Sequence, residues 1–240
     1  MTDERIALVT GANKGIGAAI AEGLAGHGLT VLIAARDPEK GAAAAARIGA
    51  YPITLDVTDD ASVAAAAREV ADRYGRLDVL VNNAGISGGF RQVPGAVDLD
   101  TVRSVLDTNV LGVIRVTEAF LPLLRRGSGA RVINVSSGTA SMARTTDPAH
   151  SFAIRATMAG YPVSKTALNM LTVQYAKALA DDGITVNAIA PGACATDFTA
   201  ALGIPVERTA AQGAAVAVGL ATTDDRTTAA FLSDEGPVPW

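Results

Sequence analysis

Tyr161 and Lys165 are the two residues whose types and spacing most directly suggest catalysis. They lie four positions apart on a predicted helix, so their side chains project from one face, and Pro162 suits the first turn of that helix. Tyrosine has a reference pKa of about 10, and a neighbouring ammonium group favours the phenolate and lowers that pKa. The pair could therefore donate a proton to an alkoxide, or remove one from an alcohol, while a hydride moves. Because Tyr-x-x-x-Lys often arises by chance, the interpretation needs support from other residues.

Further polar residues stand where they could assist such a reaction. Ser136 and Ser137 end a predicted strand, which places a hydroxyl at the carboxyl edge of the sheet, where it can hydrogen-bond a substrate oxygen. Asn82 and Asn83 end another predicted strand. Asn109 stands inside a predicted helix, where asparagine is mildly unfavourable. It is therefore either tolerated at the surface or retained for a task.

The segment Thr10–Gly17 reads Thr-Gly-Ala-Asn-Lys-Gly-Ile-Gly and joins a predicted strand to a predicted helix. Its glycines, Gly11, Gly15 and Gly17, allow a tight turn and a close approach of the backbone. The helix N-terminus offers free N–H groups and a positive dipole end to a pyrophosphate. The spacing differs from the more familiar Gly-x-Gly-x-x-Gly, and a bare glycine cluster is weak evidence. Its position between a strand and a helix nevertheless predicts a dinucleotide site.

The end of the second predicted strand indicates which dinucleotide is preferred. An acidic residue there usually holds the ribose 2′-hydroxyl of NAD, whereas a 2′-phosphate calls for a cation. This strand ends in Arg36, whose guanidinium can hold a phosphate in a bidentate fork. Lys14 could approach the same phosphate from the glycine loop. The alternative is that both are ordinary surface cations, and Asp37 is only one residue away. We expect NADP(H).

The elements that must position these residues alternate between strand and helix, which predicts βαβ units and a parallel sheet covered on both faces. No Pro/Gly/Ser-rich linker divides the chain, so we expect an α/β fold with one Rossmann domain over residues 1–240, a doubly wound parallel sheet flanked by helices. The predicted strands are Ile6–Thr10, Thr30–Ala34, Tyr51–Leu55, Val79–Asn82, Arg131–Ser136 and Thr185–Ile189, and the predicted helices are Gly15–Gly26, Pro38–Ile48, Ala61–Tyr74, Thr101–Arg125 and Tyr161–Asp181.

Two long connections interrupt this alternation, Gly138–Gly160 and Cys194–Thr209. Both begin beyond the carboxyl end of a predicted strand, where doubly wound folds bind their ligands. We expect these connections to wall a substrate pocket. His150, within the first of them, is more simply read as a solvated loop histidine than as a catalytic one.

Composition excludes several other classes of protein. The net charge of −4 argues against a nucleic-acid surface, which needs clustered basic charge. The lone cysteine, Cys194, rules out an intramolecular disulfide, and no Cys/His spacing suggests a zinc site, so we expect no metal. No signal peptide or membrane-spanning apolar run is present, so we expect a cytoplasmic protein without membrane partners.

Taken together, these motifs resemble the short-chain dehydrogenase/reductase family, in the family's order and over nearly the whole chain. The matching residues are Thr10–Gly17, Asp56-Val57, Asn82-Asn83-Ala84-Gly85, Asn109, Ser136-Ser137, Tyr161 with Lys165, Asn187 and Pro191-Gly192.

The resemblance implies a role for each matching residue. Tyr161 would be the general acid/base, Lys165 would lower its pKa and hold the nicotinamide ribose, and Ser137 would polarise the substrate carbonyl. Asn109 would anchor a water in a proton relay. Asp56 and Val57 would contact the adenine, Asn83 to Gly85 would line the cofactor, and Pro191-Gly192 with Thr196 would flank the nicotinamide. The predicted cofactor-binding set is Gly11, Asn13, Lys14, Gly15, Ile16, Gly17, Arg36, Asp56, Val57, Asn83, Ala84, Gly85, Tyr161, Lys165, Pro191, Gly192 and Thr196.

Within the family the chain looks most like the carbonyl-reductase branch, which mostly uses NADPH. Gly138–Gly160 is longer than the corresponding stretch of many members. Such an insertion covers a dimerisation face in related reductases, or it could serve as a substrate lid, so monomer and homo-oligomer both stay open. The leading hypothesis is NADPH-dependent reduction of a ketone or aldehyde. The alternatives are an NAD-dependent alcohol dehydrogenase acting oxidatively and a dinucleotide-binding sensor without turnover.

Overall fold

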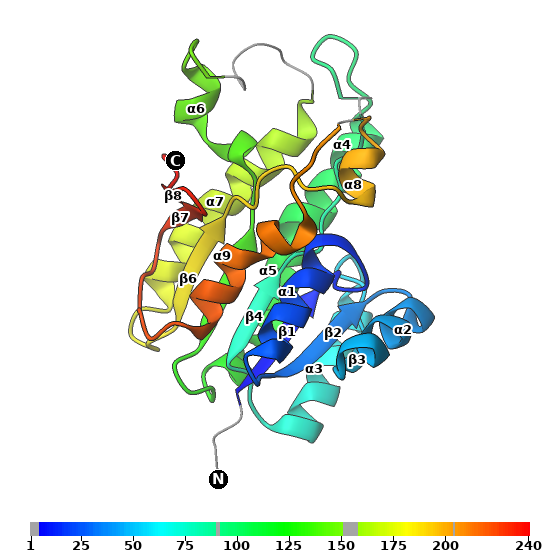
Figure 1. Cartoon of the computed structure of the whole chain (residues 1–240), viewed down its shortest axis with the longest axis vertical. Coiled ribbons are helices and arrows are strands. Elements are labelled where there is room, and N and C mark those ends of the chain that lie inside the picture. Colours follow the sequence, from blue (N-terminus) through cyan, green and yellow to red (C-terminus); the bar gives the residue numbers. More distant parts are fainter. Residues whose placement is uncertain (1–4, 90–91, 151–157, 204) are drawn as a thin grey trace.

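The chain folds around one twisted sheet, seen in a computed structural model that describes residues 5–89, 92–150, 158–203 and 205–240 (Figure 1). Every residue of its central strands is buried, as expected where helices cover both faces. Within the described residues the strands are β1 (Ile6–Thr10), β2 (Thr30–Ala35), β3 (Tyr51–Thr54), β4 (Val79–Asn82), β5 (Arg131–Val135), β6 (Thr185–Ile189), β7 (Phe231–Ser233) and β8 (Gly236–Pro237).

The strand order is β3-β2-β1-β4-β5-β6-β7-β8. Neighbouring strands run parallel from β3 through β7, and β8 returns antiparallel to β7. The chain order reverses between β1 and β4, which is the switch point where doubly wound sheets open a ligand crevice. The predicted α/β fold, with a doubly wound sheet flanked by helices, is confirmed.

Helices cover both faces of this sheet. On one face lie α1 (Gly15–Gly26), α2 (Pro38–Ile48) and α9 (Ala210–Thr222), and on the other lie α3 (Asp60–Tyr74), α5 (Gly112–Leu124) and α7 (Gly160–Ala178). Ile20 and Leu24, at helical spacing on α1, are fully buried on the first face. Phe120 of α5 is fully buried on the second. The two apolar layers hold the carboxyl ends of the strands in line at one edge.

The predicted helix Thr101–Arg125 is wrong as a single α-helix. The segment consists of α4 (Leu99–Leu106), a π-helical turn η1 (Asp107–Leu111) and α5. The π turn lies where Asn109 points its fully buried side chain inward, toward the β4–α4 connection and α7. Single π turns inside α-helices often mark functional sites.

The second half of the chain contains elements that the periodicity does not predict. Short helices η2 (Gly138–Ala140), α6 (Met142–Thr146) and α8 (Asp197–Ala200) lie within the two predicted connections. The sequence offers one usable signal for α9, because Thr209 and Gln212 form a capping box at its start. Strands β7 and β8 are too short to show an alternating pattern.

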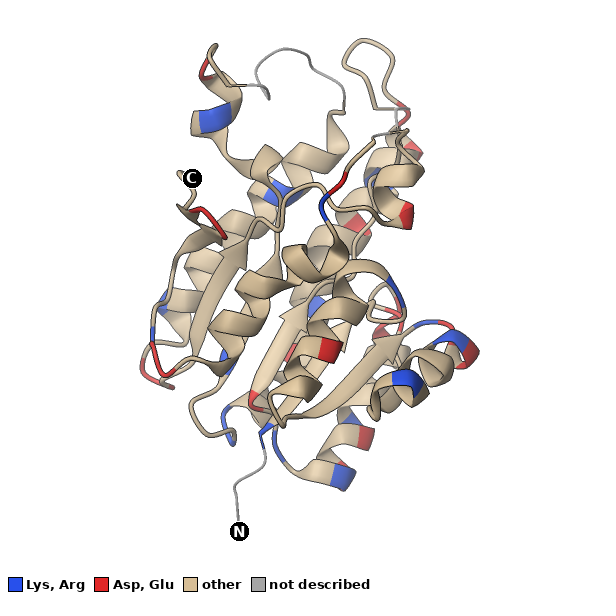
Figure 2. Ribbon diagram, viewed as in Figure 1, with Lys and Arg blue, Asp and Glu red and all other residues tan. Residues whose placement is uncertain are grey.

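Charged side chains of both signs are interspersed over the helices and loops of the described chain (Figure 2). None of the helices in the described ranges combines the length and the apolar character that a membrane span requires. The same residues contain no cluster of three side chains suited to hold a metal ion.

Candidate active site

The glycine loop is held at the switch point by hydrogen bonds between β1 and β4. The Thr10 hydroxyl accepts from the amides of Asn83 and Ala84, both at 3.0 Å. The Asn83 side chain donates to the Thr10 carbonyl at 2.8 Å. Gly11 has φ +64°, and a Cβ there would lie 2.9 Å from the Cα of Ala84. Glycine is therefore required at position 11 by both backbone conformation and the close approach of the neighbouring strand.

The first turn of α1 leaves its N–H groups available to a ligand. Asp37, Asp59 and Asp98 cap α2, α3 and α4 with their carboxylates, but no side chain caps α1. Gly15, with φ +62°, turns the backbone into this helix. An uncapped N-terminus with a positive dipole end suits a pyrophosphate. Asn13 and Ile16 are half-buried beside it, and Gly17 is buried. The loop therefore fits the dinucleotide phosphates that the sequence predicts.

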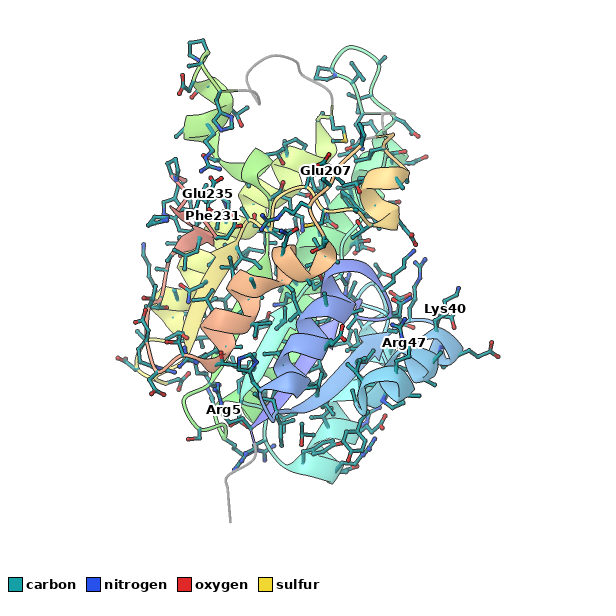
Figure 3. All side chains as sticks on the ribbon, in the orientation of Figure 1. Arg5, Lys40, Arg47, Glu207, Phe231 and Glu235 are labelled. Atoms are coloured by element: carbon teal, nitrogen blue, oxygen red, sulfur yellow. The ribbon has the colours of Figure 1, made fainter. Side chains whose placement is uncertain are left out.

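At the end of β2, Arg36 is exposed, whereas the adjacent carboxylate is already engaged. Asp37 accepts from the Lys40 amide at 3.1 Å and pairs with the Lys40 ammonium at 2.8 Å; Figure 3 shows Lys40 projecting from the start of α2. These contacts hold the pKa of Asp37 below its usual value. The Asp37 carboxylate, which left the choice between NAD and NADP open, thus caps the N-terminus of α2.

Asp56 and Val57 follow β3 at the same edge. Hydrogen bonds from the Thr58 amide (2.9 Å) and hydroxyl (2.7 Å) lower the pKa of Asp56, and the charge of Arg36 adds to this effect. Val57 is buried against α5, where a Cβ on Gly112 would lie 3.0 Å from a Val57 methyl. Asp56 is thus held near Arg36, and Val57 is held against α5.

Tyr161 and Ser137 meet at the carboxyl end of β5. Tyr161 lies in the first turn of α7, followed by Pro162 as predicted, and its hydroxyl is near enough to the Ser137 hydroxyl for the serine to lower the tyrosine pKa. The Ser137 hydroxyl is also 3.0 Å from that of Thr139. The Tyr161 ring packs against Phe198 of α8, with 5.6 Å between centroids. Although the residue as a whole is partly exposed, its hydroxyl is enclosed, and burial raises its pKa to about 12, against a smaller lowering by Ser137.

Lys165 is buried one turn further along α7, with 4% of its surface exposed. Its ammonium donates to the Val135 carbonyl at 2.8 Å and lies 5.9 Å from the centre of the Tyr161 ring. Burial lowers the pKa of Lys165 to about 8. On balance the pKa of Tyr161 is raised in this structure, because burial disfavours the phenolate; that Lys165 lowers this pKa stays a prediction.

Asn109, in the turn η1, links the β4–α4 connection to α7 beside Tyr161 and Lys165. Its carbonyl accepts from the Ile86 amide at 2.9 Å, and its amide donates to the Ile86 carbonyl at 2.9 Å and the Ser164 hydroxyl at 3.0 Å. A Cβ on Gly85 would lie 3.2 Å from the Asn109 carbonyl oxygen and 3.4 Å from the Lys165 nitrogen. The absence of a side chain at Gly85 thus lets Asn109 and Lys165 approach each other.

The connection after β6 returns to the glycine loop. Arg208 donates to the Pro191 carbonyl at 2.9 Å and packs over Gly192, which has φ +76°. A Cβ on Gly15 would lie 3.5 Å from the Thr196 methyl. The structure therefore brings Thr196 beside the glycine loop; that Pro191, Gly192 and Thr196 flank a nicotinamide stays a prediction.

Comparison with known proteins identifies this arrangement. The sequence model described as "short chain dehydrogenase" matches residues 5–206. This chain belongs to the short-chain dehydrogenase/reductase family. Short-chain dehydrogenase anuI of Penicillium roqueforti is 37% identical to it over 227 residues, 90% of this chain and 88% of that protein. As a short-chain dehydrogenase/reductase, the chain is an oxidoreductase that uses a nicotinamide dinucleotide and acts at a CH–OH group of a small molecule.

Two solved structures of the family show the same fold over nearly the whole chain. A Pseudomonas aeruginosa protein, solved as an RhlG/NADP active-site complex, has a TM-score of 0.84 and 33% identity, covering 96% of this chain and 94% of its own. An NADPH-bound carbonyl reductase from chicken fatty liver has a TM-score of 0.82 and 30% identity, covering 99% of each chain.

The two connections that we expect to wall a substrate pocket include Cys194 in one and His150 in the other. Cys194 is buried and its burial raises its pKa, consistent with a small apolar residue. Met142 is exposed on α6. His150 donates its backbone N–H to the Asp147 carbonyl, 2.9 Å away, within the same loop.

Sequence reasoning misses two residues that contact Tyr161 directly. Phe198 packs on its ring, and Gln92, in the β4–α4 connection, accepts from its backbone N–H at 2.9 Å. Both stand in connections without periodicity, so no local pattern indicates them.

Proposed function

We propose that this protein is an NADPH-dependent carbonyl reductase that reduces a ketone or aldehyde to the alcohol. The observation that carries the proposal is the placement of Tyr161 beside Ser137, with the buried ammonium of Lys165 one helical turn away and 5.9 Å from the centre of the tyrosine ring. A tyrosine whose pKa is raised to about 12 keeps its proton near neutral pH, which is the form that reduction requires. The resemblance to an NADPH-bound carbonyl reductase supports this branch of the family.

The preference for NADPH over NADH rests on the end of β2. Arg36 is exposed and free to meet a 2′-phosphate, while the Asp37 carboxylate is engaged by Lys40 and the α2 N-terminus. When bound, NADPH supplies the hydride. We assign the pyrophosphate to the first turn of α1 with Gly11, Asn13, Gly15, Ile16 and Gly17, and the 2′-phosphate to Arg36 and Lys14. We assign the adenine to Asp56 and Val57, and the ribose and nicotinamide to Lys165, Tyr161, Pro191, Gly192 and Thr196. Asn83, Ala84 and Gly85 line the cofactor between these regions.

In the proposed reaction the Ser137 hydroxyl donates a hydrogen bond to the substrate carbonyl oxygen and orients it. As the carbonyl carbon accepts the hydride, the Tyr161 hydroxyl gives its proton to the carbonyl oxygen, and the product is the alcohol. The Lys165 ammonium compensates the phenolate that remains. Asn109 holds the β4–α4 connection against α7 and anchors the water through which the phenolate regains a proton.

The substrate class proposed is a neutral, partly apolar carbonyl compound. Phe198 packs on the Tyr161 ring. Ile86, Val93 and Met142, on the connections that follow β4 and β5, are large apolar side chains exposed to solvent. Such side chains suit an apolar substrate body beside the reacting carbonyl. Because β7 and β8 extend the same sheet, we propose that the whole chain works as one domain.

The test is to titrate the purified protein with NADPH and NADH and then to follow oxidation of the preferred dinucleotide with a panel of ketones and aldehydes. Tighter binding of NADPH with turnover of a carbonyl compound supports the proposal. Turnover of alcohols with NAD alone would replace it with an oxidative dehydrogenase, and NADPH binding without turnover of any carbonyl or alcohol would favour a sensor.

A further inference from the structure

Gln92 is a polar side chain that is completely buried in a connection between elements. Its amide nitrogen donates to the carbonyls of Ser87 and Gly89, both at 2.6 Å. Its amide oxygen accepts from the Tyr161 N–H at 2.9 Å. The orientation of the amide is fixed by its partners, because two carbonyls face the nitrogen and an N–H faces the oxygen. All of these bonds run to backbone atoms, so Gln92 fixes the position of the backbone in its own loop and at Tyr161.

The start of α7 depends on this residue for its cap. No side chain of α7 or of its N-cap residue, Ala159, caps the helix. Tyr161 is the second residue of the helix, and its N–H is one of those that an N-cap side chain normally satisfies. Gln92 supplies that acceptor from another element, and its own carbonyl accepts from the Ala159 N–H at 2.8 Å. Two hydrogen bonds thus fasten the first turn of α7 to one loop residue.

Two glycines make room for this contact. A Cβ on Gly160 would lie 2.6 Å from the Gln92 amide oxygen, and a Cβ on Gly88 would lie 2.7 Å from its amide nitrogen. Real side chains do not approach so closely, so both positions exclude a larger residue while Gln92 is in place. The loop is itself fixed, because Asn109 makes two hydrogen bonds to Ile86. An unbroken series of contacts therefore runs from Asn109 through the loop and Gln92 to Tyr161.

We infer that Gln92 is a positioning residue for Tyr161: it caps α7 from the β4–α4 connection and so sets where the tyrosine hydroxyl lies relative to Ser137. The inference rests on the proposed function of Tyr161 as the proton donor. Lys165 has an independent anchor at the Val135 carbonyl, and the glycine loop has its own contacts with β4. Loss of Gln92 therefore affects the proton donor and leaves the dinucleotide site in place.

The experiment compares Gln92→Met, Gln92→Glu and Tyr161→Phe with the wild type, and uses Gln174→Met as the matched control. Gln174 is exposed on the same helix, and its side-chain amide donates to the Met170 sulfur at 3.6 Å. We expect Gln92→Met to lower kcat by about ten- to a hundredfold, because small misplacements of a reacting group cost that much. The Kd for NADPH stays within about twofold of wild type, and Gln174→Met matches wild type in both quantities.

The variant Gln92→Glu distinguishes a role in positioning Tyr161 from an unspecific disturbance of the fold. Its carboxylate faces the two carbonyls that the amide nitrogen bonded, so kcat falls near neutral pH. Protonation restores one donor, and contact with carbonyl oxygens raises the pKa of such an acid. The ratio of its kcat to the wild-type kcat therefore rises as the pH falls from about 8 to about 5, while the same ratio for Gln92→Met stays flat.

The outcomes distinguish this inference from the proposed function. Wild-type kcat in Gln92→Met overturns the inference, as does loss of NADPH binding in both Gln92 variants, which would make Gln92 a residue of the fold alone. The inference is also overturned if the ratio of the Gln92→Glu kcat to the wild-type kcat does not change with pH. Activity retained in Tyr161→Phe overturns the proposed function instead.

Discussion

The ammonium nitrogen of Lys14 lies 2.7 Å from a carboxylate oxygen of Asp197, which joins the glycine loop to the start of α8. Both side chains are mostly exposed, and the lysine holds the pKa of Asp197 below its usual value. The next residue, Phe198, packs on Tyr161. The short helix α8 thus contacts the glycine loop with one residue and Tyr161 with the next. Lys14, predicted to meet the 2′-phosphate, is engaged by a carboxylate in this structure.

Asp197→Asn should therefore tighten NADPH binding, because the phosphate no longer competes with a carboxylate for Lys14. The effect is small, less than about fivefold, because exposed ion pairs contribute little. NADH binding should not change. Fluorescence titration of both dinucleotides measures this, with Asp100→Asn as the control, since Asp100 makes a comparably exposed pair with Arg103. Weaker NADPH binding in Asp197→Asn would show that the ion pair supports the cofactor site.

Tyr161→Phe should reduce turnover by at least about a hundredfold, the usual contribution of a positioned acid/base group. The Kd for NADPH should stay nearly unchanged, because the phosphate and adenine regions are remote from the hydroxyl. Tyr175→Phe is the matched control: it removes a hydroxyl from the same helix, where it bonds Glu118 at 2.7 Å. Steady-state kinetics with NADPH titration checks both, and substantial activity in Tyr161→Phe would sink the assignment.

Arg36→Ala should weaken NADPH by about ten- to a hundredfold, as expected for loss of hydrogen bonds to a charged group. NADH should bind almost as before, because it lacks the 2′-phosphate. Arg47→Ala removes an exposed cation from the far end of α2, labelled in Figure 3, and serves as the control for general charge. Titrations with both dinucleotides decide the matter, and equal weakening would refute the phosphate contact.

Lys165 should make the stability of the protein rise with pH above about 8. Its pKa is about 8 in the folded state and 10.5 when unperturbed, so between these values the unfolded chain binds more protons. The folded state is therefore destabilised at pH 7, on the order of 3 kcal/mol, and this penalty disappears as pH approaches 10.5.

Lys165→Met should accordingly show a flatter dependence of unfolding free energy on pH over that window. Lys177→Met, at an exposed position on the same helix, should keep the wild-type dependence. Denaturant unfolding at a series of pH values measures the slopes. Identical slopes for Lys165→Met and wild type would mean that the folded and unfolded pKa values of Lys165 are the same.

Much of the fold follows from local sequence. The bounds of α1 and α2 match their predictions at both ends, because glycine and proline begin these helices and a small or left-handed residue ends them. β1, β4 and β6 match as short apolar runs. The order of motifs likewise predicts that Tyr161, Lys165, Ser137 and Asn109 come together. Each of these features depends on residues within a few positions of one another, or on the rule that parallel strands end at one edge.

The tertiary structure alone decides how those residues behave. Whether Tyr161 gains or loses a proton easily depends on the burial that α8 and β5 create around it, so the sign of its pKa shift was not predictable from the Tyr-x-x-x-Lys spacing. The π turn at Asn109, the partner of Lys14 and the cap that Gln92 gives to α7 all join residues far apart in the chain. Spacing determines which side chains share a face of a helix or an edge of a sheet. Desolvation and contacts between distant loops arise only once the chain has closed on itself, and these determine the protonation and position of each group.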